Sequence, residues 1–147
     1  TMGARKRNAA ENRKEAKRTT CTASLNGRPT SPRKMRLVVD TVRGLDVDKA
    51  INILTYTRRE TADDVLKLVK TAINVWEQKF QTSPEESELY IKTISVDSGR
   101  MLKRFQPAPM GRANRIRKRS CHVNIELASK VNANLPIEVV NNNTDTQ

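Results

Sequence analysis

The chain has 147 residues, with 28 Lys and Arg against 16 Asp and Glu, which gives a formal net charge of +12 and a pI near 10.2. A chain of this length, with 36% apolar residues, is expected to form one domain with a modest core. Its apolar runs are too short for a membrane-spanning helix or a secretory signal, so we expect a cytoplasmic protein with no membrane partner.

Several kinds of chemistry lack the residues that they need. The two cysteines, Cys21 and Cys121, lie far apart without a histidine at metal-binding spacing, so we expect buried free thiols and no metal. The five glycines are isolated, which excludes the glycine-rich loops that cradle nucleotide phosphates. The single histidine, His122, has no nucleophile or carboxylate pair placed with it. We therefore expect no enzyme, no cofactor and no small-molecule substrate.

The positive charge is concentrated in two segments. Residues 1–43 hold 12 basic and 3 acidic residues, and residues 98–130 hold 9 and 1, whereas residues 44–97 hold 7 and 10. Self-repulsion of this size is tolerated mainly where a polyanion neutralises it, and solubility alone favours interspersed charges of both signs. The distribution therefore indicates nucleic acid as the partner.

The chain begins with a basic extension, residues 1–19. We expect it to be a further RNA-contacting arm or an amphipathic helix, with a disordered tail as the alternative. The run from Cys21 to Leu25, which Asn26-Gly27 closes, is typical of a strand.

Apolar residues at helical spacing predict two helices in the next segment. The first begins at Ser31-Pro32, a capping residue followed by proline, and ends at Gly44. The second begins at Asp46, which is expected to act as its cap, and ends near Tyr56.

A long third helix is predicted after Thr57-Arg58-Arg59-Glu60, a pattern that is typical of a capping box. Its apolar stripe includes Trp76 and Phe80, which we interpret as core residues rather than base-stacking platforms. The helix is expected to end at Ser83-Pro84, and an acidic loop follows.

Alternating apolar residues then predict two strands. From Leu89 onward, Tyr90, Ile94 and Val96 are expected on one face, with Leu89 and Ile91 on the other. A second alternation runs from Cys121 to Leu127. The fold class is therefore predicted as α+β, with three helices packed on a small three-stranded antiparallel sheet and a long protruding β-hairpin.

The hairpin is predicted in the basic arm between these strands, at about residues 97–121. No acidic residue occurs from Ser98 to Ile125, and the turn residues Pro107 to Gly111 lie almost midway along the arm. At about 3.3 Å per residue, one limb of the arm would reach about 40 Å. A body of about 100 residues has a radius of gyration near only 13 Å, so the arm must extend beyond its own domain. It needs an external polyanion to become ordered.

The chain resembles the bacterial large ribosomal subunit protein 22 family. The resemblance rests on the segment Ser31 to Val38, on Leu102-Lys103-Arg104 and on the segment Gly111 to Val123, and it covers about residues 20–128. It implies a protein that binds large-subunit ribosomal RNA, supports subunit assembly, contacts neighbouring ribosomal proteins and lines the peptide exit tunnel around the nascent chain. At Ala108 and Pro109 the chain departs from the family's pattern, which usually has a basic residue followed by a small one. The resemblance therefore does not imply a charged contact at these two positions.

The residues expected to act fall into two sets. The set expected to bind RNA comprises Arg5, Lys6, Arg7, Ser31, Arg33, Lys34, Arg36, Arg100, Lys103, Arg104, Arg112, Arg115, Arg117, Lys118, Arg119 and His122. The hairpin tip expected to face the tunnel comprises Gln106, Pro107, Ala108, Pro109, Met110, Gly111 and Arg112.

The expected organisation is an extension at residues 1–19, a globular RNA-binding domain at residues 20–128 that includes the arm, and a second extension at residues 129–147. The alternative function is a free RNA- or DNA-binding regulator, such as an antitermination factor. Sequence-specific readers of single strands usually carry aromatic stacking pairs on their strands, and here only Tyr90 and Phe105 qualify. Recognition of RNA shape and phosphates is therefore favoured.

Overall fold

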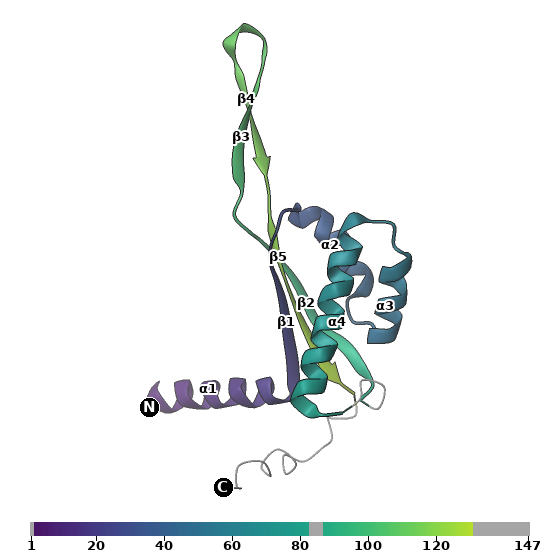
Figure 1. Ribbon diagram of the computed structural model, residues 1–147. Helices are drawn as coiled ribbons and strands as arrows, with labels where there is room; N and C mark the ends of the chain where they lie inside the picture. Colours follow the sequence, from purple (N-terminus) through teal and green to yellow (C-terminus); the bar gives the residue numbers. More distant parts are fainter. Residues whose placement is uncertain (1, 83–86, 131–147) are drawn as a thin grey trace, which may run out of the picture.

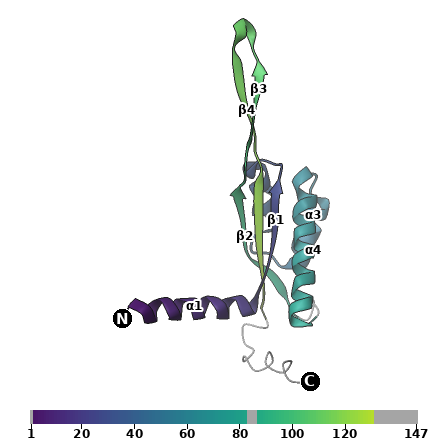
Figure 2. The same cartoon turned by 60° about the vertical axis from the view of Figure 1, so that its left-hand side comes forward.

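The computed structural model describes residues 2–82 and 87–130. Three strands form an antiparallel sheet in the order β1-β5-β2, with β1 at Thr20–Arg28, β5 at Cys121–Ser129 and β2 at Leu89–Ser98. Three helices, α2 at Pro32–Val42, α3 at Val47–Tyr56 and α4 at Glu60–Phe80, cover one face of this sheet (Figures 1 and 2). The predicted α+β class is confirmed.

The prediction of three helices is corrected, because the described residues include a fourth. Helix α1 spans Met2–Thr19 and leaves the body at the end opposite the hairpin (Figure 1). The side chains of residues 4–14 are all exposed, and no apolar stripe runs along them. The extension is therefore helical, but the described side chains do not make it amphipathic.

Helix α2 forms as its sequence predicts. Its apolar stripe (Met35, Val38, Val39, Val42) is fully buried. Pro32 lies in its first turn, where the missing N–H has no helical partner to lose. The helix gives way to Gly44, whose φ of +75° is a conformation that glycine adopts without a steric cost. Ser31 occupies the cap position, but its hydroxyl makes no capping hydrogen bond.

Helix α4 supplies the largest part of the core, and Trp76 is fully buried as predicted. The predicted capping box is wrong. The helix begins at Glu60, and the Thr57 hydroxyl donates instead to the carbonyl oxygen of Ile53 at 2.6 Å, because Thr57 still belongs to the end of α3. The helix ends at Phe80 with Gln81 in the left-handed conformation, before the predicted end at Ser83-Pro84, which lies outside the described residues.

The predicted faces of β2 are wrong for its first half. Leu89, Ile91, Ile94 and Val96 are all buried, whereas Tyr90 is only half-buried. The pairing of β2 with β5 is irregular between Ile91 and Thr93. A bulge of this kind adds one residue and reverses the alternation, so both halves of the strand direct apolar side chains to the helices.

The two thiols, Cys21 and Cys121, are free and buried, as predicted. Burial raises the pKa of both thiols, because the thiolate is poorly solvated there. Most of the predicted extension at residues 129–147, from residue 131 onward, lies outside the described residues, as does the start of the acidic loop at residues 83–86.

An ion cluster ties the start of α3 to the end of the sheet. Asp46 accepts hydrogen bonds from Lys130 at 2.5 Å and from Lys49 at 2.9 Å, while its backbone pairs with Tyr90. Asp46 thus occupies the predicted cap position, but its carboxylate binds these lysines and makes no capping hydrogen bond. The hydrogen bond from Lys130, followed by that from Lys49, lowers the pKa of Asp46 to about 2.

This cluster predicts a specific acid sensitivity. Because the folded-state pKa of Asp46 lies below its usual value of 3.8, its contribution to stability is present above pH 4 and is lost as the pH falls towards 2. Thermal unfolding of the wild type and of Asp46→Asn should therefore give midpoints that differ at pH 6 and converge near pH 2. A difference that stays constant across this range would contradict the assignment.

Candidate nucleic-acid interface

The basic arm forms a two-stranded hairpin that projects beyond the body (Figure 1). Strand β3 spans Leu102–Pro107 and pairs in antiparallel register with β4 at Ala113–Lys118. The extended hairpin expected from the sequence is confirmed. All side chains of β3 are exposed, and in β4 only Ile116 is half-buried. The hairpin therefore contributes almost nothing to its own domain's core.

The register gives the hairpin two faces of different character. Lys103, Phe105, Arg115 and Arg117 share one face, on which Lys103 lies directly opposite Arg117. Like charges that face each other across a strand pair destabilise it. Among the ion pairs that residues 2–82 and 87–130 form, none includes a hairpin cation. An anion between these side chains would turn the repulsion into attraction.

The opposite face carries Arg104 and Lys118 with Leu102 and Ile116. Both faces are thus cationic, so the hairpin is suited to a site that surrounds it with phosphates. Phe105 on the first face is 70% exposed.

The tip is a tight turn built on two residues with positive φ. Residues Pro109–Gly111 form a single 3₁₀ turn, with Met110 at φ 62° and Gly111 at φ 69°. The Ala108 N–H donates to the Arg112 carbonyl oxygen at 2.8 Å and closes the turn. Met110 is 93% exposed, so the tip presents an apolar, uncharged side chain to its surroundings.

The cations in α2 and directly after it differ in whether their side chains contact the rest of the protein. Arg33 and Lys34 are exposed near the helix start. Arg36 donates from Nη2 to the Val96 carbonyl oxygen at 3.0 Å, and Arg43 donates to the Ile94 carbonyl oxygen at 3.4 Å. These bonds hold α2 against the edge strand β2, so Arg36 has a structural contact that the sequence did not reveal.

The N-terminal cations lie far from the others. Arg5, Lys6 and Arg7 are exposed on α1, and Arg7 lies 3.7 Å from Glu11 one helical turn along. Since α1 leaves the body at the end opposite the hairpin, these residues form a separate surface (Figure 2).

His122 lies on β5, beside the irregular end of β1. Its Nδ1 atom accepts from the Gly27 N–H at 3.2 Å and lies 3.2 Å from the Asn26 side-chain oxygen. The ring thus bridges β5 to the turn that follows the paired part of β1. Its expected contact with RNA stays a prediction.

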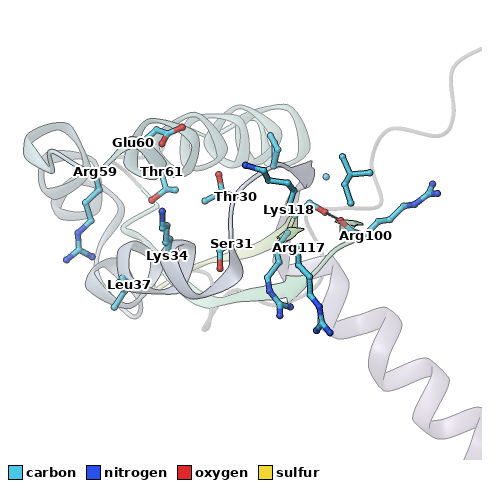
Figure 3. Close-up of a pocket in the computed structure, with 15 residues that line it drawn as sticks. Thr30, Ser31, Lys34, Leu37, Arg59, Glu60, Thr61, Arg100, Arg117 and Lys118 are labelled. Carbon is cyan, nitrogen blue, oxygen red and sulfur yellow. Dashed lines mark hydrogen bonds between the residues drawn. The ribbon is translucent and has the colours of Figure 1, made fainter. Parts of the chain in front are cut away.

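A hollow of about 890 Å³ lies where the hairpin meets the body (Figure 3). It brings together Lys34 from α2 with Arg100, Arg117, Lys118 and Arg119 from the hairpin base. Sequence reasoning placed all five among the RNA-binding residues, but not in one site. It missed a sixth cation, Arg59, since this residue lies in the segment whose net charge is negative and only the fold brings it here.

The described residues contain no group of three or more His, Cys, Asp and Glu side chains that could hold a metal ion. None of the helices in residues 2–82 and 87–130 combines the length and apolar composition that a bilayer span requires.

Comparison with known proteins places this architecture in a family. Residues 23–128 match the family model described as "Ribosomal protein L22p/L17e". A relative from Flavobacterium johnsoniae, named "Large ribosomal subunit protein uL22", is 54% identical over 129 residues, which cover 87% of this chain and 94% of the relative. Relatives of the same name from Bacteroides fragilis and Porphyromonas gingivalis are 51% and 48% identical over 89% and 90% of this chain, and over 96% and 99% of their own lengths.

Proposed function

The chain belongs to the ribosomal protein L22p/L17e family, and from this membership we propose that it is a structural, non-enzymatic constituent of the large ribosomal subunit. In this role it binds large-subunit ribosomal RNA, contacts neighbouring ribosomal proteins and supports subunit assembly. The observation that carries the proposal is the hairpin, whose facing cations lack acidic partners among the described residues. Phosphates around such an element would offset the repulsion between its cations.

The RNA contacts are divided among three surfaces. They are the hairpin, the hollow that its base forms with Ser31 and the start of α2, and the exposed cations of α1, which leaves the body at the end opposite the hairpin. Phosphate contacts of this kind fix position and orientation without reading sequence. The body would anchor on RNA helices, while the hairpin is held within the RNA interior.

The hairpin tip would line the peptide exit tunnel and face the nascent chain. Its support is the geometry: the tip, Gln106 to Arg112, stands farthest from the body and ends in exposed Met110. An apolar, uncharged apex would give a passing polypeptide no strong electrostatic hold, whereas Arg112 at the end of the turn remains available to RNA.

The domain division remains part of this proposal. We assign residues 1–19 to a basic extension, residues 20–128 to the RNA-binding domain with its arm at about residues 97–121, and residues 129–147 to a second extension. The alternative of a free regulator is not favoured, since the curated relatives carry the names of large-subunit proteins.

Sedimentation of a cell lysate through sucrose gradients tests the proposal. If the protein is an integral component, it should sediment with the large subunit at moderate salt and stay there after a high-salt wash, because the surrounding RNA traps the hairpin. A protein held only by surface phosphate contacts would be released instead, since such affinity falls by about 10³ to 10⁵ between 50 and 200 mM salt for six to ten contacts. Release into the top fractions would support the regulator and overturn the structural role.

A further inference from the structure

The hollow at the base of the hairpin joins two parts of the molecule that are otherwise weakly connected. The β2–β5 ladder ends at the pair Ser98 and Cys121, and the β3–β4 ladder begins at Leu102 and Lys118. Between them, the Gly99 N–H donates to the Ser120 carbonyl oxygen at 2.9 Å, and the Ser120 hydroxyl donates to the Arg100 carbonyl oxygen. The hairpin therefore meets the body through a narrow joint.

Gly99 shows how closely this joint is packed. A Cβ atom at this position would lie 2.6 Å from the Ser120 Oγ atom and 3.0 Å from the His122 Nε2 atom. A side chain at this position would therefore require Ser120 or His122 to move. Two backbone connections, two hydrogen bonds and the packing at Gly99 form this joint, so we expect the angle of the hairpin to the body to depend on what else spans it.

The lining of the hollow comes from both sides of the joint. The body contributes Lys34 and Leu37 from α2 and Arg59 from the α3–α4 loop, and the hairpin contributes Arg100, Arg117 and Arg119. In the view of Figure 3, Arg59 lies at one end of the hollow and Arg100 at the other, with Lys34 between them. Cations spaced along a trough match the repeated charges of an extended backbone better than a compact anion.

The electrostatics of the hollow favour an anion throughout. Among the described residues, Glu60 is the one acidic residue in its lining, and Arg28 lies 3.7 Å from it. Arg28 in turn pairs with Asp64 at 2.7 Å, which fixes the start of α4 beneath the hollow. Ser31, at the cap of α2, and Thr61, in the first turn of α4, also line it, so the positive ends of two helix dipoles add to the side-chain charges.

We propose that this hollow clamps one strand of RNA through its ribose-phosphate backbone, and that the strand sets the angle of the hairpin to the body. The proposal rests on the RNA binding proposed above and deepens it by naming the site. Phosphates contact the cations on both sides of the joint, and the exposed side chains of Leu37 and Leu102 contact ribose or base edges. Arg59 becomes an RNA-binding residue, although no basic segment contains it.

Tethered cleavage tests the location of the strand. Leu37→Cys and Leu102→Cys place a thiol on either side of the hollow, and Thr71→Cys places one on the exposed face of α4 outside the hollow. Each full-length variant is coupled to an iron chelate that generates hydroxyl radicals and is bound to protein-free large-subunit ribosomal RNA. The native thiols are buried, and unmutated protein treated in the same way controls for their labelling.

The proposal expects the two hollow-side probes to cleave the same few nucleotides, which the Thr71→Cys probe leaves intact. Separate cleavage sites, or no cleavage above the Thr71→Cys control, would overturn the clamp while leaving RNA binding in place. If the unmutated protein fails to bind this RNA, both the proposed function and the clamp are wrong.

A matched pair of arginines gives an independent test. Arg58 and Arg59 are adjacent, both exposed and equal in charge, but only Arg59 lines the hollow. Arg59→Ala should make the slope of log affinity against log salt concentration shallower by about 0.7 to 0.9, the value of one phosphate contact. Arg58→Ala should leave the slope within error of the wild type. Equal slopes for the two variants would contradict a phosphate contact at Arg59, and with it a strand that spans the hollow from Arg100 to Arg59.

Discussion

Replacing Arg115, Arg117 and Lys118 together by alanine should prevent stable incorporation into the large subunit while leaving the melting temperature nearly unchanged. All three side chains are exposed, and they belong to both faces of the hairpin. Removing three phosphate contacts should make the slope of log affinity against log salt shallower by about 2 to 3. Folding should be insensitive, or slightly improved, because the substitution also removes the repulsion between Lys103 and Arg117.

The measurement compares the variant's distribution across sucrose gradients with thermal unfolding of the purified chain. Arg58, Lys67 and Lys70 provide a control, since they are exposed on the body and their replacement by alanine removes the same charge. This control variant should be incorporated normally. Normal incorporation of the hairpin variant would contradict its role, and equal defects in both variants would show that net charge alone matters.

The parts of the fold that the sequence predicts correctly are those in which one face of an element is buried. In α2, the buried residues Met35, Val38, Val39 and Val42 lie where a period of 3.6 places them. In β5, Cys121, Val123, Ile125 and Leu127 are buried at a period of two. The core imposes these periods, so apolar spacing alone reveals the element.

The predictions are wrong where a second local arrangement competes with the one that the sequence pattern indicates. A bulge near Lys92 reverses the alternation in β2, and nothing in a single sequence marks an inserted strand residue. Thr57 fits a capping box by spacing, but its hydroxyl bonds back to the carbonyl oxygen of Ile53 in the preceding helix. At both positions two arrangements would satisfy the hydrogen-bonding groups of the backbone, and tertiary packing selects between them.

Only part of the candidate interface can be predicted from the sequence. A long run of cations without carboxylates identifies the hairpin, because self-repulsion along one segment is visible in the sequence. The hollow is not visible in this way. Arg59 and Lys34 belong to segments of opposite net charge, and only the packing of α2 against α4 brings both to the hairpin base. A site built from separate elements leaves no contiguous motif.

A substitution in the core of the body should lower folding stability, whereas the hairpin substitutions should impair incorporation and leave stability nearly unchanged. Trp76 is fully buried on α4, and its ring centroid lies 4.1 Å from that of Phe80. Trp76→Ala should lower the free energy of unfolding by about 3 to 5 kcal/mol, through lost burial and the cavity left behind. For a chain of this size the melting temperature should fall by more than about 10 °C.

Two further substitutions separate the causes of that loss. No hydrogen-bond acceptor among the described residues pairs with the buried Trp76 indole N–H. Trp76→Phe, which removes this unpaired donor and keeps most of the ring, should therefore cost much less than Trp76→Ala. Tyr56→Ala removes an aromatic ring that is 85% exposed and should change stability by no more than about 0.5 kcal/mol. A loss for Tyr56→Ala as large as that for Trp76→Ala would show that the core is elsewhere.

Added RNA should raise the melting temperatures of the core variant and the hairpin variant by different amounts. Trp76→Ala leaves every hairpin cation in place, so RNA that binds only the folded chain should restore part of the lost stability by mass action. The melting temperature of this variant should therefore rise when large-subunit ribosomal RNA is added at low salt. The alanine variant of Arg115, Arg117 and Lys118 should gain less from the same RNA, because it lacks the charges through which binding stabilises the fold. Equal gains in both variants would mean that the hairpin is not the main RNA contact.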